Sequence, residues 1–183
     1  DQLAGGAGVD NAVFSSRNNR INLGSTIRQN TGDGRDILTG IENVNGGGGN
    51  DIIRGNNAAN TLRGEDDADK LYGNNGNDKL YGGNGNDTLD GGNGNDTLDG
   101  GNGNDRLVGG DGVDTAVFSS RNNRVNLLST ARQNTGDGKD FLIGIENVKG
   151  GSGNDIIRGN NSANTLRGKD DADKLYGNNG NDK

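Results

Sequence analysis

The chain has no cysteine, histidine, methionine, tryptophan or proline among its 183 residues, and aromatic residues make up only 3% of it. Without cysteine and histidine it can form neither a disulfide nor a zinc site of the thiolate and imidazole type. Without proline, and with glycine that does not recur at every third residue, it is not a collagen. No apolar run approaches the roughly 18 residues that a membrane span needs.

Hydrophobic residues are also scarce, at 26% of the chain, while glycine occurs 37 times. Such a composition cannot fill an ordinary globular core and is more typical of disorder. The net charge of −7 argues against nucleic acid or an anionic membrane as a partner. The excess of carboxylates is better matched to a cation.

The chain shows neither a signal peptide nor an initiator methionine. Its first and last residues both fall inside repeated sequence. We therefore expect it to be a segment of a longer protein.

A nine-residue unit repeats without interruption through the middle of the chain. It reads GGNGNDTLD from Gly82, GGNGNDTLD from Gly91 and GGNGNDRLV from Gly100. Glycine occupies unit positions 1, 2 and 4, aspartate position 6 and leucine position 8. This is the G-G-x-G-x-D-x-U-x pattern of a calcium-binding parallel β-helix.

A second period of 104 residues lies over the first, since residues 1–79 align without a gap with residues 105–183. Eight nonapeptides in phase over 46–117 predict one β-roll, and 150–183 begins a second. Residues 1–13 are the end of an earlier nonapeptide run. The spacers 14–45 and 118–149 separate the runs, and each contains one disguised nonapeptide, TGDGRDILT at 31–39 and TGDGKDFLI from Thr135.

The unit predicts a strand at positions 7–9 with the position-8 side chain inward, because side chains alternate across a strand. Positions 1–6 then form the turn, where glycine and asparagine tolerate positive φ. Two units make an 18-residue coil with a strand on each side. One buried aliphatic side chain per nine ordered residues is too little to stabilise a fold, so we expect the bare chain to be unfolded or molten and a bound ligand to stabilise the folded state.

The position-6 carboxylates supply a site for that ligand. Residues one coil apart stack at the strand spacing of about 4.8 Å, so an ion midway between rungs lies about 2.4 Å from each along the axis. Calcium–oxygen distances are about 2.3–2.6 Å, and calcium accepts six to eight oxygen ligands. Magnesium requires a stricter octahedron and fits less well.

The chain resembles the RTX (repeats-in-toxin, hemolysin-type calcium-binding) family of secreted bacterial proteins. The resemblance implies an all-β, right-handed parallel β-roll, multiple Ca²⁺ ions bound between successive loops, and type I secretion followed by folding in extracellular calcium. The metal ligands it implies are the position-6 aspartates Asp10, Asp36, Asp51, Asp69, Asp78, Asp87, Asp96, Asp105, Asp114, Asp140, Asp155, Asp173 and Asp182.

Several polar residues leave alternatives open. Asn60 and Asn164 put a neutral amide at position 6. The pairs Asp66–Asp67 and Asp170–Asp171 are either further ligands or surface charges, and Glu42 and Glu146 either reach an ion or face solvent. The position-9 tyrosines favour packing on the sheet surface over a sugar site. These tyrosines are Tyr72, Tyr81 and Tyr176.

The sequence thus predicts a calcium-dependent structural and interaction module of a secreted or surface protein, and not an enzyme. Near-identical copies joined without a linker favour a tandem array that continues or self-associates end to end. The alternative is the secretion and folding tail of an RTX enzyme or toxin. An ice-binding face, built on the row of turn asparagines, is less favoured because such faces use threonine.

Overall fold

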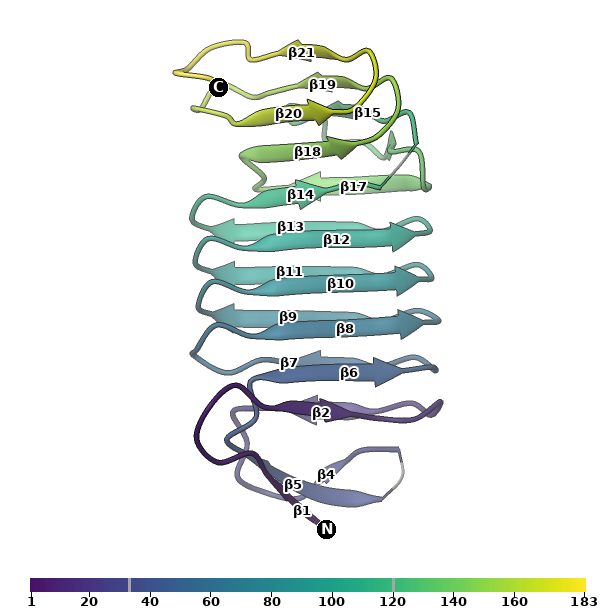
Figure 1. Ribbon diagram of the computed structural model, residues 1–183, viewed down its shortest axis with the longest axis vertical. Helices are drawn as coiled ribbons and strands as arrows, with labels where there is room; N and C mark the ends of the chain where they lie inside the picture. The colour runs from purple at the N-terminus through teal and green to yellow at the C-terminus, as the bar shows by residue number, and fades with distance from the viewer. Residues whose placement is uncertain (33, 120) are drawn as a thin grey trace.

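The computed structural model describes residues 1–32, 34–119 and 121–183, and within them the chain is all β, with parallel strands stacked into a long solenoid (Figure 1). Residues 18 apart pair between neighbouring coils, as Leu80 does with Leu98. The predicted parallel β-roll of 18-residue coils is confirmed. The same part of the chain contains no helix that could cross a membrane.

One long sheet, here called the front sheet, faces the viewer in Figure 1. Its strands, in spatial order, are β2 (Asn11–Val13), β6 (Asn43–Gly47), β8 (Thr61–Asp66), β10 (Lys79–Asn84), β12 (Thr97–Asn102), β14 (Thr115–Val117), β18 (Asn147–Gly151) and β20 (Leu166–Lys169).

The back sheet lies behind it. Its order is β16 (Gln133–Asn134), β17 (Lys139–Ile143), β13 (Arg106–Asp111), β11 (Thr88–Asn93), β9 (Lys70–Asn75), β7 (Ile52–Arg54) and β3 (Arg20–Asn22). A short sheet lies near each end of the solenoid. One contains β1 (Gln2–Ala4), β5 (Arg35–Thr39) and β4 (Gln29–Asn30), and the other β15 (Arg124–Asn126), β19 (Ile156–Arg158) and β21 (Lys174–Tyr176).

The central strands are longer than the sequence predicts. β11 runs from unit position 7 through position 3 of the next unit, so the turn shrinks to three residues, as at 94–96. The position-4 glycine makes this tight turn possible. Gly103 has φ +140°, and a Cβ there would lie 1.4 Å from the carbonyl oxygen of Gly85 in the neighbouring coil.

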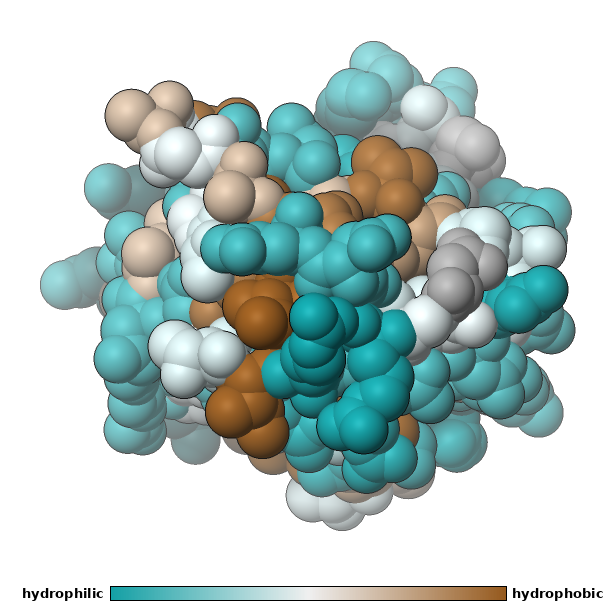
Figure 2. All heavy atoms as spheres, turned by 90° about the horizontal axis from the view of Figure 1, so that it is seen from below, coloured by the Kyte–Doolittle hydropathy of each residue, from teal (hydrophilic) through white to brown (hydrophobic). Residues whose placement is uncertain are grey.

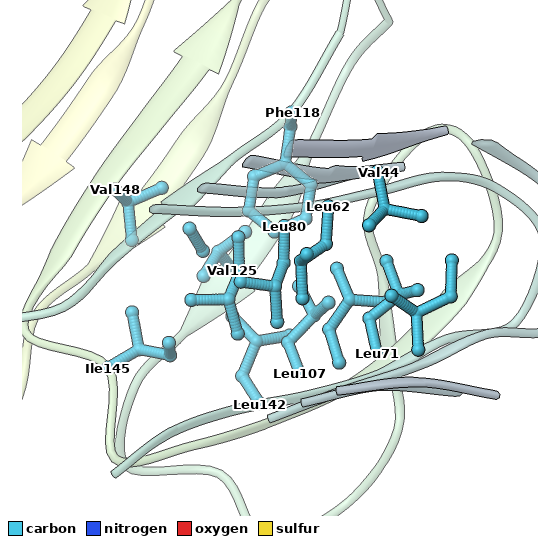
Figure 3. Close-up of a cluster of buried hydrophobic side chains, with 14 of the residues drawn as sticks. Val44, Leu62, Leu71, Leu80, Leu107, Phe118, Val125, Leu142, Ile145 and Val148 are labelled. Atoms are coloured by element: carbon cyan, nitrogen blue, oxygen red, sulfur yellow. The ribbon is translucent and has the colours of Figure 1, made fainter. Parts of the chain in front are cut away.

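The core is a double ladder of position-8 side chains between the two sheets (Figure 3). Leu62, Leu80 and Leu98 come from the front sheet, and Leu71, Leu89 and Leu107 from the back sheet; all are fully buried. Inward aliphatic side chains of the strands form most of this core, which is continuous along the solenoid, and Ile41, Phe118 and Ile145 join it from between the strands.

Outward side chains at position 9 pair across neighbouring strands. The Arg54 guanidinium lies 4.4 Å from the centroid of the Tyr72 ring, and Arg158 lies at the same distance from Tyr176. Arg63 lies 4.1 Å from the ring centroid of Tyr81. These contacts are cation–π pairs on the sheet surface, which agrees with the packing role expected for the tyrosines.

The spacers hold more of the repeat than the sequence indicates. Ile21 on β3 pairs with Ile53 on β7 and is buried, so 14–22 forms half of a coil although its sequence lacks the glycines. In the second copy, Val125 pairs with Ile157 in the same way. The disguised nonapeptides also join the stack, since Leu142 pairs with Leu107.

The core ladder gives a direct test of packing. Leu89→Ala should lower the free energy of unfolding of the calcium-loaded protein by about 3 kcal/mol, because it leaves a cavity between strands that cannot close. Leu128→Ala, at a leucine that is 53% exposed, is the matched control and should change it by less than about 0.5 kcal/mol. Urea titration measures both, and equal effects would contradict the assignment of the ladder as the core.

Candidate metal centre

The turns place the position-6 residues in two rows, one along each edge of the solenoid. Alternate units feed opposite edges, because each coil contains two units and two turns. The first row, called the Asp87 row, contains Asp51, Asp69, Asp87, Asp105 and Asp140. The second, called the Asp96 row, contains Asn60, Asp78, Asp96 and Asp114.

Within each row, one carboxylate oxygen is held by the backbone of the preceding coil. The Asp69 N–H donates to Asp87 Oδ1 at 2.8 Å, and the Asp87 N–H donates to Asp105 Oδ1 at 2.8 Å. The Asp78 N–H donates to Asp96 Oδ1 at 2.7 Å. Each carboxylate therefore fixes the register of the turn before it, and one oxygen of the pair is satisfied.

In every aspartate of the two rows except Asp140, and also in Asp10 and Asp155, Oδ2 is buried and has no hydrogen-bond partner among the described residues. Leaving a buried charged oxygen unpaired is costly, so such atoms normally mark an ion or another missing partner. The carboxylates with an unpartnered Oδ2 are Asp10, Asp51, Asp69, Asp78, Asp87, Asp96, Asp105, Asp114 and Asp155.

The position-1 glycine leaves room beside this oxygen. A Cβ on Gly82 would lie 2.4 Å from Asp87 Oδ2 and 2.4 Å from the Gly100 carbonyl oxygen of the next coil. Gly73 has the same relation to Asp78 and to the carbonyl of Gly91. A carboxylate oxygen and a backbone carbonyl thus border a space that any other residue at position 1 would fill.

Burial also changes the acidity of the rows. Desolvation raises the pKa of Asp69 and of Asp105 to about 7, and neighbouring carboxylates in the row add to the effect. It raises the pKa of Asp78, Asp87 and Asp114 to about 6. A bare row of charges is therefore unfavourable, and a cation that neutralises it would be favoured.

Two glutamates extend the Asp96 row at the coils where the spacers end. The Asp10 N–H donates to Glu42 Oε2 at 2.9 Å, and the Asp114 N–H donates to Glu146 Oε2 at 2.9 Å. Glu42 and Glu146 therefore take the place of a position-6 aspartate. The sequence left their role open because the unit there is shortened to GIENVN and GIENVK.

The amides at position 6 form a different arrangement. Asn60 Oδ1 accepts from the Asn56 N–H of its own turn at 2.8 Å, and its Nδ2 donates to the Glu42 carbonyl at 2.9 Å. Asn164 repeats both contacts, with Asn160 and with Glu146. Both polar atoms of each amide are satisfied by the protein.

The remaining predicted ligands lie at the margins of the rows. The Thr135 hydroxyl donates to Asp140 Oδ2 at 2.5 Å, and the Thr31 hydroxyl donates to Asp36 Oδ2. The N-terminal ammonium and Thr31 lower the pKa of Asp36 through hydrogen bonds. Asp173 and Asp182 accept from the backbone of Asp155 and Asn164 but are less buried.

The aspartate pairs beside the rows bond neighbouring turns. Asp67 accepts from the Gly49 N–H at 3.1 Å, and Asp66 accepts from the Asn84 amide at 2.9 Å. Asp171 accepts from the Gly153 N–H at 3.0 Å, and all these carboxylates are exposed. These contacts match the surface-charge alternative.

Across residues 1–32, 34–119 and 121–183, no group of three or more acidic side chains is placed to hold a metal ion. A cation in these turns would therefore need backbone carbonyl oxygens beside the carboxylates. Such a set contains only hard oxygen donors, which suits calcium. The donors present in the two rows thus fit that ion.

The family described as RTX calcium-binding nonapeptide repeat matches the chain in four copies, at residues 45–80, 54–89, 81–116 and 149–183. Together these copies cover more than half of the chain. No curated protein sequence matches it.

The raised acidities predict how the metal-free chain responds to pH. Because the folded-state pKa of Asp69 and Asp105 is about 7, against about 4 when unfolded, protonation favours folding. This stability is present in full below about pH 4 and is lost as the pH rises through 6 to 7. In chelator, circular dichroism should therefore show more β-structure at pH 5 than at pH 8. More β-structure at pH 8 than at pH 5 would contradict the raised pKa values assigned to these buried carboxylates.

Proposed function

Because the chain belongs to the RTX calcium-binding nonapeptide repeat family, we propose that it is a structural and interaction module of a secreted bacterial surface protein, held folded by calcium. The surface protein would be an adhesin, an S-layer, matrix or filament component. The proposal is supported by the two buried carboxylate rows, in which Oδ2 of every aspartate except Asp140 has no hydrogen-bond partner within the described residues.

The ligands proposed for calcium are the position-6 carboxylates, joined by carbonyl oxygens of the glycine-containing turns. The well-formed coils from Asp51 to Asp114 supply the central sites, and Asp155 and Asp173 begin the next set. Asp10, Asp36, Asp140 and Asp182 are assigned more peripheral sites, because they lie where the rows start or end. Neutralising the carboxylates would remove the repulsion within each row and lower the raised pKa values.

The proposed setting is extracellular. Proteins that carry these repeats are typically secreted by bacteria, and millimolar calcium outside the cell would saturate sites of the affinity common in extracellular modules. A chain that needs calcium to fold would stay unfolded before export. Metal binding would then be part of its folding free energy rather than an addition to a stable fold.

A tandem array is supported by the continuity of the solenoid between the two 104-residue copies. β14 pairs with β18 across the second spacer, so the front sheet continues where a linker would interrupt it. The back sheet ends at β17 and β16, and the separate sheet of β15, β19 and β21 follows it. The face seen in Figure 2, at the end that carries the N terminus, shows apolar atoms among hydrophilic ones. Continuing coils or a second copy would cover this apolar surface.

The alternative of a secretion and folding tail differs in what lies outside this segment, since an enzyme or toxin domain would then precede it. We assign no catalysis to the segment itself, which has no histidine or cysteine to serve as base or nucleophile. Ice binding is less favoured. The turn asparagines bond one another, as Asn102 Nδ2 does with Asn84 Oδ1 at 2.9 Å, which leaves fewer free donors for ordered water.

The calcium requirement is testable by circular dichroism at pH 7.5. The chain should lack β-structure in chelator and gain it after about millimolar Ca²⁺ is added, whereas the same concentration of Mg²⁺ should produce much less. The variant Asp87→Ala should need more calcium to fold, because it removes a carboxylate ligand together with the Oδ1 that accepts the Asp69 N–H. Full β-structure in excess chelator would overturn the proposal.

A further inference from the structure

The first turn of each spacer has one buried asparagine at position 6, Asn19 in the first spacer and Asn123 in the second. Register places them there, because the Asn19 N–H donates to Asp51 Oδ1 at 2.6 Å and the Asn123 N–H donates to Asp155 Oδ1 at 2.8 Å. This is the contact that each aspartate of the rows makes with the next coil. Asn19 is 3% exposed and Asn123 2% exposed. The nonapeptide match at 45–80 begins after Asn19, and the match at 149–183 begins after Asn123.

The side-chain nitrogen of each asparagine lies where three oxygens converge. Asn19 Nδ2 is 2.6 Å from the Arg17 carbonyl oxygen, 3.0 Å from the Gly46 carbonyl oxygen and 2.9 Å from Asp51 Oδ1. Asn123 Nδ2 repeats the set at 2.6 Å from Arg121, 2.8 Å from Gly150 and 2.9 Å from Asp155 Oδ1. Two carbonyls and one carboxylate thus face a single donor group.

The orientation of the amide follows from its surroundings. Turning the group over would place its oxygen against three other oxygens, so the nitrogen must occupy this position. The amide oxygen of both residues accepts no hydrogen bond within the described part of the chain. The side chain is therefore held through its nitrogen alone.

An NH₂ group surrounded by hard oxygens does what a small cation would do there. Its hydrogens direct partial positive charge toward a carboxylate and two carbonyls. They replace the hydrogen bonds that these oxygens would make with water, without adding net charge. At the equivalent position of the regular coils, Asp69 and Asp87 have a negative side chain and an unpartnered Oδ2. A negative residue there requires a positive ion, whereas the amide does not.

We propose that the side-chain amides of Asn19 and Asn123 take the place of a calcium ion, so that the first turn of each spacer is a metal-free rung. The inference rests on the proposed calcium function and concerns which turns are loaded. It also explains the position of these residues in the fold, since β3 ends the back sheet and β15 ends its short sheet. A turn at the end of a row has a neighbouring coil on one side only, and the amide nitrogen satisfies the oxygens that face it there.

The experiment counts bound calcium in the 183-residue chain by isothermal titration calorimetry and, independently, by metal analysis after dialysis. The double variant Asn19→Asp/Asn123→Asp should bind two more ions per chain than the wild type, because each new carboxylate meets the two carbonyls and the carboxylate that the amide now satisfies. In chelator, this variant should be less stable than the wild type. The control Asn19→Ala/Asn123→Ala should lose stability without gaining ions.

The outcomes separate this inference from the proposed function. If the wild type binds no calcium, the proposed function fails. If the wild type binds calcium and the folded Asp variant gains no ions, the amide inference alone fails.

A second measurement uses the wild type only, so a variant that does not fold leaves the inference testable. Anomalous difference maps of crystals grown in millimolar calcium should show peaks beside Asp87 and Asp96 and none within bonding distance of the Asn19 or Asn123 side chains. A calcium peak bound to Asn19 Oδ1 would overturn the inference that the amide replaces the ion.

Discussion

The fold depends on one interaction, the hydrogen bond between each position-6 carboxylate and the backbone of the neighbouring coil, which buries a negative charge that we propose a cation to neutralise. One oxygen of Asp87 accepts the Asp69 N–H and so sets the register between coils, while the other is buried and finds no hydrogen-bond partner in the described part of the chain. Without the proposed cation, the row consists of desolvated carboxylates whose pKa values are raised toward neutrality. Each carboxylate therefore holds two coils together and at the same time adds an unfavourable buried charge, and the cation that we propose would offset that charge.

The thin core is the physical reason why we expect the fold to depend on a cation. A single inward leucine per strand buries little apolar surface for each ordered nonapeptide, in contrast to a globular domain of the same length. Cross-strand contacts such as Arg54 with Tyr72 and the asparagine ladders of the turns add small increments. Such a solenoid gains stability coil by coil, so its length can vary while each coil keeps the same structure.

The repeat period was sufficient to predict the sheets, the inward leucines and the two carboxylate rows, because periodicity alone fixes which side chains share a face. It could not predict the strand length, since glycine at positions 1 and 2 reads as turn and yet continues the strand in β11. It also missed Asn19 and Asn123. Residues 14–22 lack the glycines, and only the pairing of Ile21 with Ile53 reveals that they occupy a coil. The role of Glu42 was not predicted either, because the unit that contains it is shortened. The glutamate side chain is longer than that of aspartate and reaches the Asp10 N–H.

The central claim is that folding and the filling of the carboxylate rows are one event. The dependence of the unfolding free energy on calcium concentration tests it most directly, because its slope against the logarithm of free calcium gives the number of ions released on unfolding. If folding and filling are one event, the slope will be steep and correspond to several ions, and the folded state will disappear as calcium approaches zero. A stability that does not change with calcium concentration would contradict it.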